Sequence, residues 1–255
     1  MRSSEPMSPR EVFLVTGASK GLGKSICKTL AQEGYTVIGL ARSSTELTNL
    51  GNYLNGLNNG SQINACDLSD LEQVKLAGAN IIQRHPRIHG VIHNAGIIGP
   101  VGRMFSVSDD AWNETMTVNL LSAQLLTRIL YPAMVEASRC RVTTISSGAA
   151  INSLVSWSAY CSSKAALDMW TRCLADEGAD DHVSAISIAP GIVDTNMQAT
   201  IRSATKDDFP LVDRFIEFHQ NGDLVSPDDV AHALFNLMTT HTMEQSGLRF
   251  DVRDL

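Results

Sequence analysis

Three side chains capable of acid–base chemistry lie close together in ISSGAAINSLVSWSAYCSSK, which spans residues 145–164. Ser147 precedes Tyr160 by 13 residues, and Lys164 follows Tyr160 by four. In a helix over residues 158–178, Tyr160 and Lys164 would be i and i+4 neighbours on one face. A lysine cation about 4 Å from the phenol would contribute roughly 4 kcal/mol at an effective dielectric constant of about 20. We expect this to lower the pKa of Tyr160 by about three units, to about 7.

A tyrosine of this kind is suited to moving a proton at neutral pH. Tyr160 can donate a proton to a carbonyl oxygen or accept one from an alcohol, while Ser147 hydrogen-bonds the same oxygen. A nicotinamide cofactor would supply the accompanying hydride. A tyrosine and a lysine at this spacing also occur in ordinary amphipathic helices, so the hypothesis needs a cofactor site elsewhere in the chain.

A glycine-rich segment, TGASKGLG at residues 16–23, follows the first predicted strand and opens the first predicted helix. Glycine lets backbone approach a ligand where a side chain would collide, and a helix N-terminus offers unpaired N–H groups to a pyrophosphate. The alternative is a glycine-rich turn that binds nothing. The strand–turn–helix context favours a dinucleotide site. The residues expected to form it are Gly17, Ser19, Lys20, Gly21, Leu22 and Gly23.

The segment after the second predicted strand, LARSST, distinguishes NADP from NAD. An NAD site usually has a carboxylate here for the ribose 2′-hydroxyl, but this chain has Arg42 and Ser43 and no acid before Glu46. A guanidinium group pairs well with a 2′-phosphate, and Lys20 could add a second cation. We therefore expect NADP(H) as the cofactor. The alternative is that Arg42 is a solvated surface arginine.

Asp67 and Leu68 follow the third predicted strand, in ACDLSD. The carboxylate of Asp67 can accept a hydrogen bond from the adenine amino group of the cofactor. Alternatively, it caps the helix that follows or stabilises the dipole of that helix. The sequence leaves both roles open.

Short apolar runs rich in β-branched residues alternate with longer helical patterns. The predicted strands are 12–17, 36–41, 62–67, 90–96, 141–146, 183–189 and 248–252, and the predicted helices are 22–33, 45–56, 69–85, 109–137 and 158–178. This alternation predicts an α/β fold, a Rossmann-type doubly wound parallel sheet of about seven strands with helices on both faces. We expect residues 1–9 to be a flexible tail and residues 10–255 to form a single domain. Residues 195–226 would then be a lid over the substrate.

The composition excludes several other classes of protein. The 255 residues are 44% apolar and 18% charged, and the net charge of −7 argues against binding to nucleic acid or an anionic membrane. No apolar run is long enough to span a membrane, and the N-terminus lacks the apolar core of a secretory signal. The five cysteines include no CxxC pair. We therefore expect free thiols in a reducing cytoplasm, with no disulfide framework and no metal site.

Together these motifs resemble those of the short-chain dehydrogenase/reductase family, from the first strand to the sixth. The shared motifs are TGASKGLG at 16–23, HNAG at 93–96, Asn119 in MTVNLL, Ser147, YCSSK at 160–164 and APGIVDT at 189–195. The resemblance implies a catalytic tetrad of Asn119, Ser147, Tyr160 and Lys164. In that family the asparagine lies at a helix kink and holds a water that passes protons to the lysine, and the lysine also binds the nicotinamide ribose. Further cofactor contacts are implied at Asn94, Ala95, Gly96, Pro190, Gly191, Val193 and Thr195.

One position departs from the family pattern, because His93 stands where asparagine is usual. We expect His93 to support the sheet rather than the chemistry. The C-terminal third is similar to the sepiapterin reductase and benzil reductase branch, on the segments WSAYCSSKAAL, APGIVDTNMQATIR, NGDLVSPDDVA and SGLRFDVRD. That resemblance implies an NADPH-dependent carbonyl reductase acting on a vicinal diketone such as benzil, or on a pterin side-chain ketone.

The candidate substrate residues are Asp251, Trp157 and Met197, together with Ser147 and Tyr160. By the resemblance, Asp251 matches the aspartate that anchors the pterin, and capping of the last strand is the alternative. Trp157 and Met197 are either pocket walls or packing residues. A further set of large aromatic residues is assigned to the core or an interface: Phe215, Phe218 and Trp170.

Other functions stay open beside the reductase. The same tetrad would serve an NADP-dependent alcohol dehydrogenase, because it works in both directions. A non-catalytic NADP(H)-binding sensor or scaffold is less consistent with four catalytic residue types in place. An epimerase or dehydratase on the related extended fold usually has a longer chain. The resemblance also implies a homodimer or homotetramer, formed through the helices at 109–137 and 158–178.

Overall fold

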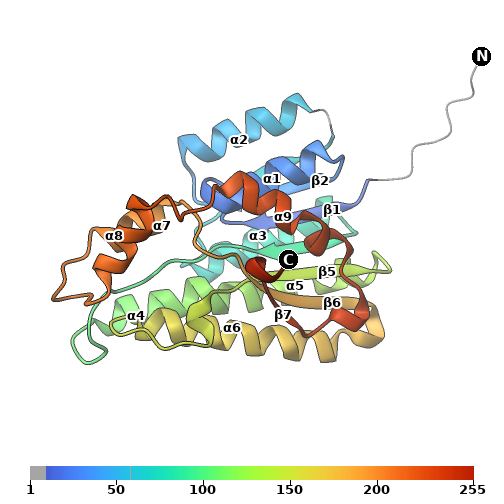
Figure 1. The fold of residues 1–255 in the computed structure, drawn as a ribbon. Coiled ribbons are helices and arrows are strands. Elements are labelled where there is room, and N and C mark those ends of the chain that lie inside the picture. Colours follow the sequence, from blue (N-terminus) through green and yellow to red (C-terminus); the bar gives the residue numbers. More distant parts are fainter. Residues whose placement is uncertain (1–9, 58) are drawn as a thin grey trace, which may run out of the picture.

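The strands coincide with the apolar, β-branched runs of the sequence, and all seven enter one sheet. The structure, a computed structural model, describes residues 10–57 and 59–255, so the tail expected at residues 1–9 lies outside the described residues. The strands are β1 (Val12–Thr16), β2 (Thr36–Ala41), β3 (Gln62–Ala65), β4 (Gly90–His93), β5 (Cys140–Ile145), β6 (Val183–Ala189) and β7 (Arg249–Asp251). They are parallel, in the order β3-β2-β1-β4-β5-β6-β7 (Figure 1). The chain reverses its direction of travel across the sheet between β3 and β4, which marks the edge where such sheets bind ligands.

Two layers of helices enclose this sheet. The helices are α1 (Gly21–Gln32), α2 (Thr45–Gly56), α3 (Leu71–Arg84), α4 (Asp109–Met116), α5 (Ser122–Val135), α6 (Ser158–Glu177), α7 (Asn196–Arg202), α8 (Val212–Gln220) and α9 (Pro227–Thr240). Residues of α1, α2 and α9 share one hydrophobic core, and residues of α3, α5 and α6 share another. The predicted doubly wound, single-domain fold is therefore confirmed.

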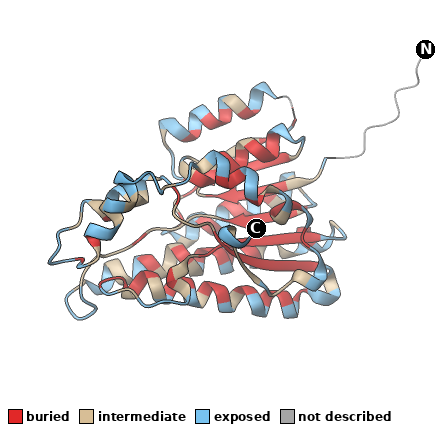
Figure 2. Ribbon diagram, viewed as in Figure 1, coloured by how far each residue is buried: buried red, intermediate tan, exposed pale blue. Residues whose placement is uncertain are grey.

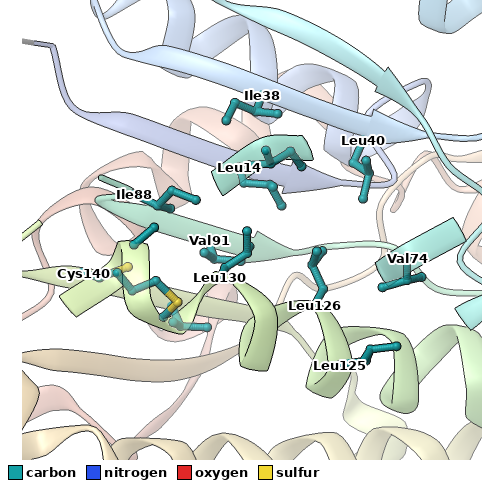
Figure 3. Close-up of a cluster of buried hydrophobic side chains, with 14 of the residues drawn as sticks. Leu14, Ile38, Leu40, Val74, Ile88, Val91, Leu125, Leu126, Leu130 and Cys140 are labelled. Atoms are coloured by element: carbon teal, nitrogen blue, oxygen red, sulfur yellow. The ribbon is translucent and has the colours of Figure 1, made fainter. Parts of the chain in front are cut away.

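Alternate residues of the central strands point into the two cores, as the period of a strand requires. Phe13 and Val15 of β1 pack in the core with α1, α2 and α9, whereas Leu14 between them packs in the other core. In that second core, Val74 of α3 and Leu126 of α5 lie near Leu14 (Figure 3). The middle strands are buried along their whole length (Figure 2), because both faces of the sheet are covered.

One helix, α9, is absent from the sequence prediction although the sequence signals it clearly. The hydroxyl of Ser226 accepts a hydrogen bond from the backbone N–H of Asp229, and Pro227 occupies the first helical turn. A serine N-cap, a proline in the first turn and acidic residues beside it are typical of a helix start. In α3 the cap is Asp70, whose carboxylate accepts from the backbone N–H groups of Glu72 and Gln73.

The long helix predicted at 109–137 is interrupted. Thr117–Leu121 forms a π-helical segment between α4 and α5, with Asn119 at its centre. A π-helical turn inserts one extra residue and re-aims the side chains next to it, and such turns are frequent at functional sites. The helix kink implied at Asn119 is therefore present.

Residues 195–226 leave the sheet after β6 and contain α7 and α8. The base of this segment is closed by a bridge between Val193 and Val225. The N–H of Asp194 donates to the carbonyl of Val225, and the N–H of Val225 donates to the carbonyl of Ile192. The segment therefore starts and ends at the same point of the sheet edge.

Candidate active site

A cavity of about 1120 Å³ lies along the carboxyl ends of the strands. It is lined by every residue predicted to bind cofactor or substrate except Ser43, which is exposed beside Arg42. Of the predicted tetrad, Ser147, Tyr160 and Lys164 line the cavity, whereas Asn119 is buried behind it. The structure thus brings together residues from eight segments that are far apart in the sequence.

The glycine loop is shaped for close approach of backbone to backbone. A Cβ atom on Gly23 would lie 2.3 Å from the carbonyl oxygen of Gly17 and 2.4 Å from Nδ2 of Asn94. Gly17 itself has a φ of +68°, which strongly favours glycine. No side chain caps the N-terminus of α1, so its N–H groups suit the phosphates of a dinucleotide.

Asn94 and Thr16 hold this loop against β4. Nδ2 of Asn94 donates to the carbonyl of Thr16 at 2.9 Å. The hydroxyl of Thr16 accepts from the backbone N–H groups of Asn94 and Ala95, each at 3.1 Å. The side chain of Asn94 therefore holds the glycine loop in place, so Asn94 could support a cofactor through the shape of this loop.

Basic side chains stand where the sequence predicts the 2′-phosphate. Arg42 and Lys20 are exposed and line the cavity. Glu46 is fully exposed, and its pKa is lowered by its own backbone N–H, by the hydroxyl of Ser44 and by the charge of Lys20. The donors present therefore fit a phosphate ester at this end of the cavity.

Asp67 and Leu68 line the cavity just after β3, where the sequence predicts the adenine. One carboxylate oxygen, Oδ1, accepts from the N–H of Ser69 at 3.0 Å and from its hydroxyl at 2.8 Å. The helix that follows is capped by Asp70 instead. Asp67 therefore does not cap α3, and its carboxylate instead stabilises the turn before that helix.

Tyr160 is 6% exposed, and burial raises the pKa of its hydroxyl to about 12. A hydrogen bond with the side chain of Ser147 opposes this effect without overcoming it. The sequence-based expectation of a pKa near 7 is therefore wrong for the protein's own groups. Its physical error is that it counted the lysine charge and not the loss of solvent around the phenol.

Lys164 lies beneath Tyr160, with its Nζ 5.8 Å from the centroid of the phenol ring. The ammonium group donates to the carbonyl of Ile145 at 2.7 Å. Burial lowers the pKa of Lys164 to about 8, and the charge of Asp168 acts in the opposite direction. The ammonium nitrogen thus lies 5.8 Å from the ring centroid, whereas about 4 Å was assumed from the sequence. The lowered pKa also reduces the fraction of Lys164 that is charged near neutral pH.

The side chain of Asn119 links the π-helical segment to the floor of the cavity. Its Oδ1 accepts from the N–H of Ile97 at 2.8 Å, and its Nδ2 donates to the carbonyl of Ile97 and to the hydroxyl of Ser163, each at 2.9 Å. A Cβ on Gly96 would lie 3.4 Å from both Asn119 Oδ1 and Lys164 Nζ. The amide group is thus fully used in holding the loop next to Lys164.

Aromatic side chains line the part of the cavity where the sequence predicts the substrate. Trp157 stacks on Phe209 with ring centroids 5.0 Å apart, and Phe215 of α8 lies 5.4 Å from Trp157. Trp157, Phe215 and Phe218 line the cavity, as Met197 does. The assignment of Phe215 and Phe218 to packing alone is therefore incomplete, and their i and i+3 spacing on one face of α8 was the available signal.

Asp251 lines the cavity, but its charge is already paired. Its carboxylate accepts from Nε of Arg253 at 2.7 Å and from the backbone N–H of Arg253 at 3.1 Å. These bonds lower the pKa of Asp251. The capping alternative is thus borne out for the turn after β7, and a substrate would meet an Asp251–Arg253 pair rather than a lone carboxylate.

Two further results bear on the type of site. His93 is buried, hydrogen-bonded to Thr127, and packed edge-on against Trp170, which is the supporting role expected for it.

Among the residues that the structure describes, no cluster of three His, Cys, Asp or Glu side chains is arranged to hold a metal ion. In the same part of the chain, no helix has the length and apolar character that a membrane crossing requires.

The chain matches known proteins over most of its length. Residues 11–206 match the family model described as short chain dehydrogenase. A benzil reductase ((S)-benzoin forming) of Bacillus subtilis is 35% identical over 251 residues, which cover 96% of this chain and 99% of the relative. An L-xylulose reductase of Caenorhabditis elegans is 38% identical over 191 residues, which cover 72% of each protein.

Crystal structures share the fold. A short-chain dehydrogenase/reductase of Saccharomyces cerevisiae has a TM-score of 0.86 at 29% identity and covers 96% of both chains. A short chain dehydrogenase of Escherichia coli complexed with NADPH has a TM-score of 0.82 at 29% identity, covering 95% of this chain and 96% of the other. The likeness therefore extends over nearly the whole molecule.

Proposed function

Because the chain belongs to the short-chain dehydrogenase family, an oxidoreductase family, we propose that it is an NADPH-dependent carbonyl reductase. Its substrate would be an activated ketone, with a vicinal diketone such as benzil as the first choice. The observation that carries this proposal is the convergence of Ser147, Tyr160 and Lys164 on the cavity that also contains the glycine cradle. The 35% identity to a benzil reductase supports the choice of substrate.

The residues of the cavity fit NADP(H). The cradle at Gly17 and Gly23 would hold the pyrophosphate, and Arg42 with Lys20 would hold the 2′-phosphate. When bound as NADPH, the cofactor supplies the hydride. A relative of the same fold was crystallised with NADPH, which favours this cofactor over NADH.

The chain's own residues would orient the carbonyl and supply the proton. Ser147 and Tyr160 line the same cavity, and the side chain of Ser147 is near enough to lower the pKa of the phenol, so one carbonyl oxygen could accept from both hydroxyls. A phenol whose pKa is about 12 stays protonated at neutral pH, which is the form a proton donor needs. Lys164, with a pKa of about 8, is mostly charged at pH 7 and would stabilise the phenolate that forms.

The substrate end favours a diketone over a pterin. The wall formed by Trp157, Phe215 and Phe218 suits an aryl group. Asp251 is neutralised by Arg253, so it offers a pterin ring no free charge. We propose that residues 195–226 act as the lid over this site, since Phe209 and Phe215 of that segment pack on Trp157.

Two alternatives use the same site. An NADP-dependent alcohol dehydrogenase would run the proton transfer in reverse, starting from a Tyr160 phenolate. A sensor or scaffold would bind NADP(H) without turnover. The raised pKa of Tyr160 disfavours the first alternative in the protein alone, since the phenolate is scarce below pH 10.

The test follows NADPH oxidation by the purified protein with benzil, a diacetyl-type diketone and sepiapterin, with NADH in parallel. We expect turnover with NADPH on benzil and a loss of about 10²–10⁴-fold in kcat for Tyr160→Phe. The variant should keep its affinity for NADPH, which is measured by cofactor fluorescence. Tight NADPH binding without turnover on any of these carbonyls would contradict the reductase and favour the sensor.

We also propose a cytoplasmic homodimer or homotetramer. The cysteines are free, as expected in a reducing compartment. Leu121, at the junction of α4 and α5, and Met169 of α6 are exposed apolar residues on the helices expected to pair. Sedimentation at micromolar concentration should show a dimer or tetramer, and a monomer would contradict this part of the proposal.

A further inference from the structure

A partly buried ion pair near the predicted catalytic residues was not predicted from the sequence. Arg249 of β7 donates from Nε to Oδ2 of Asp168 in α6, at 3.1 Å. From Nη2 it also donates to the backbone carbonyl of Ser147, at 3.0 Å. One guanidinium group therefore joins the last strand, the helix of Lys164 and the backbone of the catalytic serine.

Burying these two charges carries a desolvation penalty that a purely structural contact would not require. The side chains of Arg249 and Asp168 are only 20% and 5% exposed. Removing two charges from water costs several kcal/mol per ion, and apolar residues of similar volume often stabilise a fold equally well. The presence of two charged side chains here, instead of apolar ones, suggests that their charge or their directed hydrogen bonds contribute to function.

Asp168 is placed to act on Lys164. The two residues are i and i+4 on α6, and both are buried. Asp168 is the charged residue whose field raises the pKa of Lys164 against the effect of burial. Within the described residues, the two contacts recorded for the ammonium group are with uncharged groups: the carbonyl of Ile145 on β5 and the ring of Tyr160 on α6.

Arg249 forms a hydrogen bond with only one of the two carboxylate oxygens of Asp168. Its Nε bonds Oδ2, while Oδ1 is buried and has no hydrogen-bond partner among the described residues. The carboxylate therefore keeps a strong field in a medium of low dielectric constant. The same guanidinium fixes the carbonyl of Ser147, whose hydroxyl meets Tyr160.

We propose that Arg249 and Asp168 are positioning residues of the proton-transfer site: Arg249 fixes the backbone of Ser147 and the carboxylate of Asp168, and Asp168 holds Lys164 in its charged form. This inference rests on the proposed reductase function, in which Lys164 must be charged. It makes the C-terminal strand β7 part of the catalytic apparatus, although Arg249 follows Ser147 by 102 residues.

The experiment measures the pH profile of kcat/KM for NADPH-dependent reduction of benzil between pH 6 and pH 10. In Asp168→Asn the alkaline limb should move down by about one pH unit, because an opposite charge nearby raises a lysine pKa by about 1–3 units. Activity at pH 9 should fall about tenfold, with a smaller change at pH 6. Arg249→Met should lower kcat about tenfold at all pH values, and Arg249→Lys should restore part of it.

A double variant separates positioning from structure. Asp168→Leu with Arg249→Met replaces the ion pair by an apolar pair, which keeps the protein folded even where a single variant does not. A structural role predicts wild-type kcat and an unchanged alkaline limb in this protein. The positioning role predicts that both change while the Kd for NADPH does not.

The matched control is Arg141→Met. Arg141 is a buried arginine at the opposite end of β5 that also donates to a backbone carbonyl, that of His241. It should lower the unfolding temperature and leave the pH profile unchanged. A wild-type pH profile in both Asp168→Asn and the double variant would overturn the inference.

Failure of the proposed function would be distinguishable. If the wild-type protein has no turnover, the side-chain ¹³Cε resonance of Lys164 is titrated by NMR in wild type and in Asp168→Asn, or in the double variant where Asp168→Asn does not fold. A downward shift of the titration midpoint by about one unit would support the inference without any reaction. An unchanged midpoint would overturn it.

Discussion

A single methyl group on Gly23 should damage the cofactor site more than the fold. In Gly23→Ala the new Cβ would lie 2.3 Å from the carbonyl oxygen of Gly17 and 2.4 Å from Nδ2 of Asn94. Ordinary contacts of this kind begin at about 3.4 Å, so the atoms must separate by about 1 Å. Neither neighbour can move freely, because Nδ2 of Asn94 is bonded to the carbonyl of Thr16.

The cost follows from these contacts. Overpacking of this size typically costs about 1–3 kcal/mol, and the loss of one hydrogen bond of Asn94 adds about 1 kcal/mol. A total of about 2–4 kcal/mol corresponds to a fall in Tm of roughly 4–16 °C for a chain of this length. A shift of about 1 Å in the N–H groups proposed to hold the pyrophosphate should weaken NADPH binding at least about tenfold, which is about 1.4 kcal/mol.

The assay pairs thermal unfolding with fluorescence titration of NADPH, both on Gly23→Ala and on Gly56→Ala. Gly56 ends α2, and a Cβ there would meet nothing within 4 Å. The control should bind NADPH as the wild type does and should be as stable or slightly more stable. Wild-type affinity for NADPH in a folded Gly23→Ala protein would refute the assignment of this loop as the cofactor cradle.

Arg42→Asp replaces the expected partner of the 2′-phosphate by a carboxylate, and it should lower the NADPH to NADH ratio of kcat/KM at least about tenfold. Steady-state kinetics with both cofactors measures this, and an unchanged ratio would contradict the 2′-phosphate site. Burial lowers the pKa of His93 to about 3, so the unfolded state takes up a proton below about pH 6.5 that the folded state refuses. Stability present above that pH is lost as the pH falls, by about 2 kcal/mol between pH 7 and pH 5. Urea unfolding of His93→Asn should lose this pH dependence, whereas the exposed variant His232→Asn should retain it; equal pH dependence in all three proteins would show that His93 is not responsible.

The parts that the sequence predicted well are those set by local pattern. The strand at 36–41 and the helix at 45–56 were predicted with the bounds found in the structure, because apolar β-branched runs and a serine N-cap are local signals. The glycine loop and the Tyr160–Lys164 pair were also local. Helix α9 was missed although Ser226 and Pro227 signal its start.

The parts that could not be predicted depend on contacts between distant segments. The bond from Arg249 to the carbonyl of Ser147 joins residues 102 positions apart. A helix kink at Asn119 was implied only by the family resemblance, and the side chain of Asn119 in the π-helical segment bonds to Ile97 and Ser163, which belong to other elements. None of these leaves a periodic trace in the sequence.

The behaviour of the Tyr160–Lys164 pair shows which physical effect dominates at this site. Helical spacing correctly predicts that the two side chains are neighbours, and Coulomb attraction then predicts a phenol that ionises near neutral pH. Burial disfavours the charged form of each group and so opposes this attraction. It raises the pKa of Tyr160 to about 12 and lowers that of Lys164 to about 8. Below pH 8 the protein alone thus favours a neutral phenol beside a charged lysine. That combination keeps Tyr160 in the protonated form that reduction of a carbonyl requires, with a lysine cation to stabilise the phenolate that results. Oxidation of an alcohol would instead require the phenolate at the start, which the positive charge of an oxidised nicotinamide would favour.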